Sequence, residues 1–349
     1  MTLAVNLAQG ASNNVTFRNR IINGAMVIDQ RNAGASVSFT SSFAYYLDRF
    51  GGRLSSSSGS TIAQSSTAPT GFNKSLLVTI GTGASATAGQ LNAFYQAIEG
   101  YNVADLGFGT ANAKPITLSF WVRSSLTGTF GGSFQNNANN RSYPFTYTIN
   151  SANTWEYETI TIAGDTTGTW ETTNSGGLTI WFDLGSGSNY QGTAGAWAGA
   201  DYRAASGTTS LVATSGATIN ITGVQLEAGT TASPFEYRQY TTELQLCQRY
   251  YQKFNGSQYL NESVGAAAAT TVIYYNKPFI TSMRAAPTFS SSGTFNADGT
   301  SYSTVTLTMP YASTETARVD GAGSGFTAGQ AYGLTHQSTN SYLQFTAEL

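Results

Sequence analysis

The sequence has little charge, one cysteine and one histidine. Charged residues make up 10% of the 349 residues, well below the roughly 25% of typical soluble domains. Because the chain has 16 basic and 18 acidic residues, it lacks the excess of positive charge that is typical of proteins that bind nucleic acid or an anionic membrane. No window approaches the ~20 apolar residues that span a bilayer. The start lacks a signal-peptide pattern, so we expect synthesis in a host cytoplasm without standard secretion.

Catalytic groups are equally scarce. His336 alone would have to carry any Ser-His-Asp chemistry, and no G-x-S-x-G elbow is present, which favours a structural or exposed histidine. The sequence contains no zinc-ligand spacing, phosphate-binding loop or dinucleotide fingerprint. Cys247 has no intrachain partner, and we expect a small buried hydrophobe. These absences predict that the protein is not an enzyme.

Glycine and aromatic residues are abundant instead, with 38 Gly, 20 Tyr and 19 Phe. Together with many Ser, Thr and Asn residues, they predict a neutral polar surface, which suits sugar-like partners that offer hydroxyls instead of charges. The length suggests two domains, or a large β-domain and a smaller one.

Short strand-like runs, separated by Gly and Asn clusters, follow one another at intervals of ten to twenty residues. We expect strands at 76–80, 96–100, 116–123, 143–149, 155–162, 178–184 and 218–226. In 116–123, Ile116 and Phe120 share one face, while Ser119 and Trp121 share the other, as in a half-buried strand. No helical segment separates these runs. The pattern therefore predicts an all-β fold with an antiparallel jelly-roll sandwich.

A second β-region follows at 257–349, with its clearest strands at 269–275, 287–291, 304–309 and 341–347. At about ninety residues we expect a small C-terminal β-sandwich.

The stretch 225–254 joins the two regions and alone has helical spacing. Leu244, Cys247, Tyr251 and Phe254 are three, four and three residues apart. Thr242 could cap such a helix, with Gln245 completing a capping box and Gly256 as a stop. A helix of about a dozen residues needs burial, either beneath the two β-regions or against the same helix of neighbouring subunits. The expected domains are an attachment arm (1–20), the jelly roll (21–237), the joint helix (238–256) and the C-terminal domain (257–349).

Several motifs resemble those of a family of bacteriophage tail-fibre and receptor-binding proteins. They are NRIINGAMVIDQRNAG at 19–34, YYLDRF at 45–50, QLEAGTTASPFEYR at 225–238, TELQLCQRYYQK at 242–253, SMRAAPT at 282–288 and QFTAEL at 344–349. The motif at 225–238 is the most specific mark. The resemblance implies a virion tail protein that adheres to host-surface polysaccharide, assembled as a homotrimer whose seam would be Leu244, Cys247, Tyr251 and Phe254. It also implies attachment to the baseplate or another tail protein through the N-terminal arm.

The first region also resembles a carbohydrate-binding-module jelly roll, through QAIEG at 96–100, ITLSFWVR at 116–123 and WEYETITI at 155–162. Such modules often hold a structural calcium ion. Because Asp and Glu are scattered along this chain, the resemblance assigns no calcium ligands.

Aromatic residues in Gly-rich loops are the candidate glycan contacts. The loop 185–207 contains Tyr190, Gln191, Trp197, Asp201, Tyr202 and Arg203, and Trp170 lies in another loop. These side chains either anchor their loops or contact a ligand. Trp121, Trp155 and Trp181 are expected in the core or a subunit interface. A rival receptor site in the last domain would use Tyr302, Tyr311, Phe326, Tyr332 and His336.

Two other functions stay open. Glu156 and Glu158 lie two residues apart on a predicted strand, near the separation used by inverting glycosidases, which would suit a glycan depolymerase. Two Glu on the solvated face of a strand are nevertheless commonplace. A capsid decoration, collar or baseplate spacer would need no ligand at all.

Overall fold

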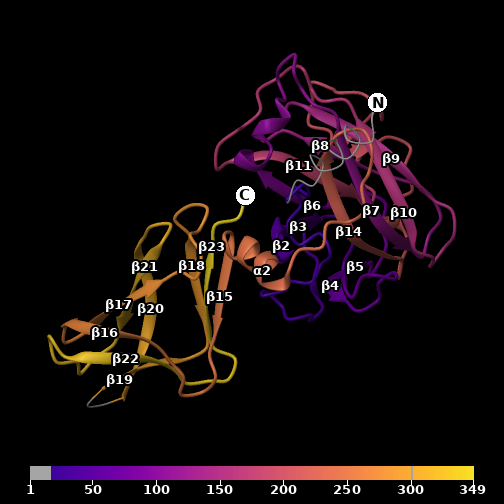
Figure 1. The fold of residues 1–349 in the computed structure, drawn as a ribbon. Coiled ribbons are helices and arrows are strands. Elements are labelled where there is room, and N and C mark those ends of the chain that lie inside the picture. Colours follow the sequence, from indigo (N-terminus) through magenta and orange to yellow (C-terminus); the bar gives the residue numbers. More distant parts are fainter. Residues whose placement is uncertain (1–16, 300–301) are drawn as a thin grey trace. The chain divides into compact units, whose positions relative to one another are not determined.

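The computed structural model describes residues 17–299 and 302–349. Nearly all of the regular structure is β, which confirms the expected fold class. The chain forms two compact units, one extending to Gln239 and including Leu349, the other covering Tyr240–Glu348 (Figure 1). Within the described ranges, no helix has the length and apolar character needed to cross a membrane.

The first unit is a sandwich of two six-stranded antiparallel sheets, as predicted. One sheet has the order β1 (Val37–Ser38), β4 (Thr61–Ser65), β5 (Ser75–Thr79), β14 (Thr218–Ala228), β7 (Ile116–Ser124) and β10 (Glu156–Ile162). The other has the order β2 (Ala44–Leu47), β3 (Phe50–Leu54), β6 (Asn92–Glu99), β11 (Gly176–Asp183), β8 (Gly128–Gln135) and β9 (Ser142–Ile149). Short connections are η1 (Gly100–Asn102), η2 (Ala104–Leu106), η3 (Ser188–Tyr190), η4 (Leu211–Ala213) and the parallel pair β12 (Gln191–Gly192) and β13 (Ala204–Ala205).

One hydrophobic core lies between the two sheets. Ile116, Leu118, Phe120 and Val122 of β7 are all fully buried, as the alternation predicts. Thr117 and Ser119 on the other face are buried too, so only Trp121 and Arg123 show the partial exposure expected of a half-buried strand. Phe120 meets Phe182 of β11 edge to face, at 5.3 Å between ring centroids. The residues of β7 that alternate with the core-facing ones point to the outer side of the sheet. Trp121 is one of them, so its ring is not part of this core.

The second unit differs from the small sandwich expected for it. A closed barrel has the order β16 (Asn261–Ala269), β17 (Val272–Pro278), β21 (Thr316–Ala322), β20 (Tyr302–Ala312), β19 (Phe295–Asp298) and β22 (Ala331–His336). A three-stranded sheet of β15 (Tyr251–Asn255), β23 (Tyr342–Thr346) and β18 (Thr288–Ser292) accompanies it. Because β16 pairs with both β17 and β22, the barrel strands have no free edge.

The joint helix is shorter than predicted. α2 covers only Tyr240–Gln248, and it groups with the second unit. After α2 the chain makes a tight turn, in which the N–H of Tyr250 donates to the carbonyl of Cys247, and it then continues as β15. Tyr251 and Phe254 therefore pair in a sheet with β23 and do not continue a helical stripe. Aromatic side chains favour a strand, and pairing with β23 decides the conformation here.

A charged network is buried in the second unit. Glu262 of β16 forms an ion pair with Lys277 of β17, and its Oε2 lies 3.2 Å from Nε2 of His336 on β22. His336 Nδ1 lies 2.7 Å from Ser341 Oγ. Because His336 is fully buried and Ser341 nearly so, we interpret this histidine as structural.

Candidate functional site

An aromatic groove lies on the outer side of the sheet that contains β7 and β10. Its volume is about 530 Å³, and it is lined by Thr70, Phe72, Ser119, Trp121, Tyr157, Gly223, Ala232, Ser233, Pro234, Phe235 and Tyr237. We call it the aromatic groove below.

Two paired strands supply its floor. Tyr157 of β10 lies directly opposite Trp121 of β7 in the antiparallel ladder. Their ring centroids are 5.3 Å apart, with 49° between the planes. Cross-strand aromatic pairs of this kind stabilise a sheet, yet Tyr157 keeps 45% of its surface exposed. The floor therefore offers a rigid aromatic surface to solvent.

A glycine brings the floor and the wall together. Gly223 lies at a bulge of β14 against β7 and has a φ of 62°. A Cβ on Gly223 would lie 2.7 Å from Phe72 Cζ and 3.1 Å from Trp121 Cδ1. Only glycine lets both rings approach the strand this closely.

Gly223→Ala should therefore destabilise the first unit more than the strain of a positive φ alone does. We expect a loss of about 2 to 3 kcal/mol, because the left-handed backbone costs about 1 to 2 kcal/mol and the clash adds to it. Gly216→Ala is the matched control, since Gly216 has a φ of 74° but no atom within 4 Å of its added Cβ. Thermal unfolding and near-ultraviolet circular dichroism measure the difference, and equal losses in the two variants would contradict the packing role of Gly223.

The wall consists of three rings from two segments. Phe72 contacts Phe235 and Tyr237, with centroids 5.1 and 5.5 Å apart. Tyr237 donates a hydrogen bond from its hydroxyl to the carbonyl of Gly71 at 2.8 Å. This bond fastens the turn that carries Phe72 to the segment that carries Phe235 and Tyr237.

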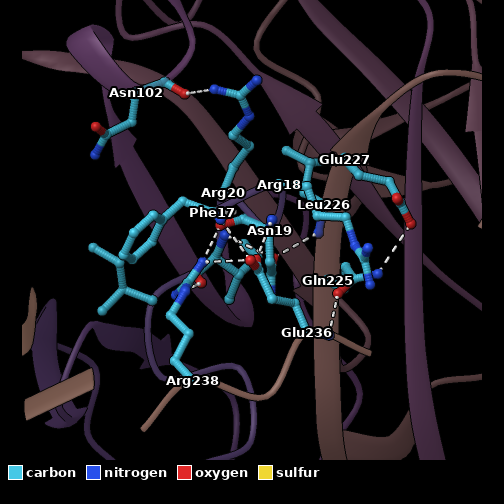
Figure 2. A network of polar contacts seen from close by, with 12 residues as sticks. Phe17, Arg18, Asn19, Arg20, Asn102, Gln225, Leu226, Glu227, Glu236 and Arg238 are labelled. Carbon is cyan, nitrogen blue, oxygen red and sulfur yellow. Dashed lines mark hydrogen bonds and ion pairs between the residues drawn. The ribbon is translucent and has the colours of Figure 1, made fainter. Parts of the chain in front are cut away.

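Hydrogen bonds that join Glu236 and Arg238 to residues 17–21 hold the segment that carries Phe235 and Tyr237, and we call them the clamp (Figure 2). Glu236, between the two groove aromatics, accepts the backbone N–H of Phe17 at 2.6 Å and that of Asn19 at 2.8 Å. Arg238 donates to the carbonyls of Ile21 and Asn19. Hydrogen bonds to charged groups are stronger than neutral ones, so this clamp fixes the wall of the aromatic groove.

Further bonds extend the clamp along β14. Asn19 accepts the N–H of Leu226 and donates to the carbonyl of Val224, at 3.0 and 3.1 Å. Gln225 accepts the N–H of Glu236 at 2.8 Å. The specific motif at 225–238 thus ties the N-terminal segment to the sandwich. Phe17 to Arg20 therefore belong to the first unit and not to a separate arm, while residues 1–16 of the expected arm lie outside the described residues.

The lining of the aromatic groove suits a neutral ligand that is rich in hydroxyl groups. None of the described residues that line it is charged. Tyr157 and Tyr237 are 45% and 61% exposed, so their rings can contact the apolar face of a sugar. The exposed Thr70 lines the same space, and its hydroxyl can exchange hydrogen bonds with sugar hydroxyls.

The predicted loop aromatics lie elsewhere in the first unit. Trp170 and Trp197 pack against each other at 5.4 Å and share Phe108 as a neighbour. Their indole N–H groups donate to the backbone carbonyls of Thr167 and Ala163. Contacts of this kind anchor the loops that carry Trp170 and Trp197 to the first unit.

Tyr190 and Arg203 form a second cluster. The Arg203 guanidinium lies 4.7 Å from the ring centroid of Trp181 and 5.3 Å from that of Tyr190, and it is paired with Asp201. Gln191 donates to the carbonyl of Ser186, and the backbone N–H of Tyr202 donates to the hydroxyl oxygen of Ser142. None of these predicted contact residues lines the aromatic groove, so their role in glycan binding stays a prediction.

The carboxylate pair does not line the aromatic groove either. Glu156 accepts the backbone N–H groups of Asn150 and Ser151, and the bonds from Asn150 lower the pKa of its carboxyl. Burial, with the nearby charge of Glu156, raises the pKa of Glu158. Both alternate with Tyr157 along β10 and so face the other side of the strand.

In the second unit, the rival receptor residues separate into buried and exposed groups. Phe326, Tyr332 and His336 are core residues, whereas Tyr311 is 66% exposed. The side chain of Tyr302 lies outside the described residues. Across the described ranges, no group of three or more His, Cys, Asp or Glu side chains is placed to hold a metal ion.

Comparisons with known proteins find similarity to solved structures alone. No family model matches the sequence, and no curated protein matches it. The enzymatically active domain of a tailspike protein of bacteriophage CBA120 is 13% identical, with a TM-score of 0.35 over 61% of this chain and 22% of that chain. A xylan-binding domain of Paenibacillus barcinonensis is 14% identical, with a TM-score of 0.30 over 52% of this chain and 92% of that domain. A carbohydrate-binding module of Clostridium thermocellum is 12% identical, with a TM-score of 0.30 over 53% and 89%. At these TM-scores the similarity carries no argument about function.

Proposed function

We propose that the protein is a non-catalytic adhesin that binds a neutral glycan in the aromatic groove. The observation that carries this proposal is the Trp121–Tyr157 pair at the floor of an uncharged groove, in which Trp121 is half-buried and Tyr157 is 45% exposed. An exposed aromatic surface of this kind costs hydration free energy unless a ligand covers it. A glycan covers it without introducing charge.

The groove is also built in advance of binding. Its floor is part of a sheet, and its wall is fastened by Tyr237 to Gly71 and by Glu236 to the N-terminal segment. Binding therefore requires little ordering of the protein, and such preorganisation preserves affinity for a ligand that contributes weak contacts.

Trp121→Ala should weaken glycan binding by about 2 kcal/mol, or roughly 30-fold, because the central aromatic contact is lost. Affinity electrophoresis through gels that contain dextran, laminarin, galactomannan, arabinoxylan or alginate measures the retardation. We expect retardation by one of the four neutral polymers and not by the anionic alginate.

Trp155→Ala is the control for this experiment. Trp155 is also partly buried and lies next to β10, but it does not line the aromatic groove. The proposal fails if Trp121→Ala and Trp155→Ala are retarded equally, or if alginate alone retards the protein.

The setting proposed for this activity is a virion tail, where the protein would attach the particle to a host-surface polysaccharide. The motif resemblance supports this setting. The homotrimer, the tail partner at the N-terminal end and the absence of catalysis are parts of the same proposal. Mass spectrometry of purified particles, light scattering of the protein and an assay for released reducing sugar test them in turn.

A further inference from the structure

The barrel carries an exposed tyrosine–arginine stack that the aromatic groove does not explain. The guanidinium of Arg318 on β21 lies 4.1 Å from the ring centroid of Tyr274 and 4.6 Å from that of Tyr311. Tyr274 belongs to β17 and Tyr311 to β20, which are the two neighbours of β21 in the barrel. We call these three residues the tyrosine–arginine platform.

The platform is rigid because strands and an ion pair position it. Arg318 lies opposite Asn276 in one ladder and opposite Tyr311 in the other. Asp320 holds the guanidinium with two bonds, Nε to Oδ1 at 2.8 Å and Nη2 to Oδ2 at 3.0 Å. A bidentate pair fixes the plane of the guanidinium, so the arginine keeps the two rings apart at a set spacing.

The platform is also open. Tyr274 is 40% exposed and Tyr311 is 66% exposed, although each has one side against the arginine. Asn276 and Thr308 are exposed beside them and offer an amide and a hydroxyl. Arg318 and Asp320 pair with each other, so the platform has no net charge beside its aromatic rings and polar groups.

We propose that the tyrosine–arginine platform is a second glycan-contacting site, which takes an uncharged sugar segment, so that each chain holds a polysaccharide at two places. This inference rests on the proposed function, because it assigns the same class of ligand to a different unit. Two linked sites on one polymer raise the apparent affinity beyond that of either site alone.

The area of the platform argues for a sugar and against a protein partner. Two aromatic side chains bury about 150 to 250 Å² each even when fully covered, whereas a stable protein interface needs about 800 Å² from each partner. Threonines 304, 306 and 308 of β20 are exposed alongside, and they offer hydroxyls in place of further apolar area.

Calorimetric titration of the full chain with neutral hexasaccharides of glucose, xylose, mannose and galactose tests the inference. We expect two hexasaccharides per chain for the unaltered protein, one for Trp121→Ala, one for Tyr311→Ala and none for the double variant. Tyr274→Ala should repeat the result of Tyr311→Ala. Tyr259→Ala is the matched control, since Tyr259 is 68% exposed in the same unit but outside the platform, and it should keep both sites.

The outcomes separate this inference from the proposed function. One hexasaccharide per chain, lost in Trp121→Ala and kept in Tyr311→Ala, would overturn the platform site and leave the groove intact. A site lost in Tyr311→Ala but not in Trp121→Ala would support the platform and overturn the groove. No binding of any hexasaccharide would overturn both. A concentration-dependent dimer that disappears in Tyr311→Ala, seen by light scattering, would assign the platform to a second copy and overturn the inference.

Discussion

Glu236→Ala is expected to cost the first unit about 2 to 4 kcal/mol of its free energy of unfolding and to abolish glycan binding in the aromatic groove. Glu236 accepts two backbone N–H groups, those of Phe17 and Asn19, and a hydrogen bond to a charged group contributes about 1.5 to 3 kcal/mol, less at the exposed Phe17, where water can replace the acceptor. Removing the carboxylate leaves both donors without their acceptor. It also frees the segment that places Phe235 and Tyr237 in the wall.

Urea unfolding and amide hydrogen exchange measure this effect, and exchange at Phe17 and Asn19 should accelerate in particular. Glu171→Ala is the control in the same unit, because the Glu171 carboxylate accepts a hydrogen bond of 3.5 Å from Thr173 and lies outside the clamp. We expect a loss below about 1 kcal/mol there. If Glu236→Ala proved as mild as Glu171→Ala, the clamp would not hold the wall.

The second large effect concerns the buried network of the barrel. Glu262→Gln is expected to lower the free energy of unfolding of the second unit by about 3 to 5 kcal/mol, because Lys277 loses its buried counter-charge. For a unit of this size the melting temperature should fall by 10 °C or more, at about 4 to 8 °C per kcal/mol. Glu315→Gln is the control, since Glu315 is exposed and should change stability by less than about 0.5 kcal/mol.

This network also gives the barrel a dependence on pH. Burial raises the pKa of Glu262, but hydrogen bonds from His336 and Lys277 outweigh burial and hold the pKa below its ordinary value of 4.5. A carboxyl whose pKa is lower in the folded state contributes stability above its unfolded pKa and loses it as the pH falls through the folded pKa. The barrel should therefore weaken on acidification below about pH 4.5, and Glu262→Gln should lack that part of the pH dependence. An unchanged acid response in Glu262→Gln would contradict this assignment.

Regular alternation made the sandwich predictable. The runs at 116–123 and 155–162 correspond closely to β7 and β10, because a buried face every second residue is a property of the sequence itself. The Gly-rich β8 gave no such signal, since its glycines leave few side chains to alternate. The barrel was missed because strand closure depends on pairing between distant segments, such as β16 with β22.

The aromatic groove was only partly visible in the sequence. Trp121 was assigned to the core or an interface, although it shares its strand face with Thr117, Ser119 and Arg123. A tryptophan on an otherwise polar face is the signal that could have found it, and Tyr157 gives the same signal on β10. The wall could not be predicted, because Phe72 and Phe235 meet only after the chain has folded.

The segment 225–238 contributes both to the lining of the aromatic groove and to the clamp, and this affects how the protein can be divided into fragments. A shortened version that starts at residue 24 would remove no side chain of the groove lining, and by inspection of that lining it would look harmless. It would nevertheless take away the partners of Glu236 and Arg238, so the shortened domain should lose ligand binding together with the hydrogen bonds that hold the wall. A fragment made to test binding in the aromatic groove should therefore begin no later than Phe17 and extend through Arg238.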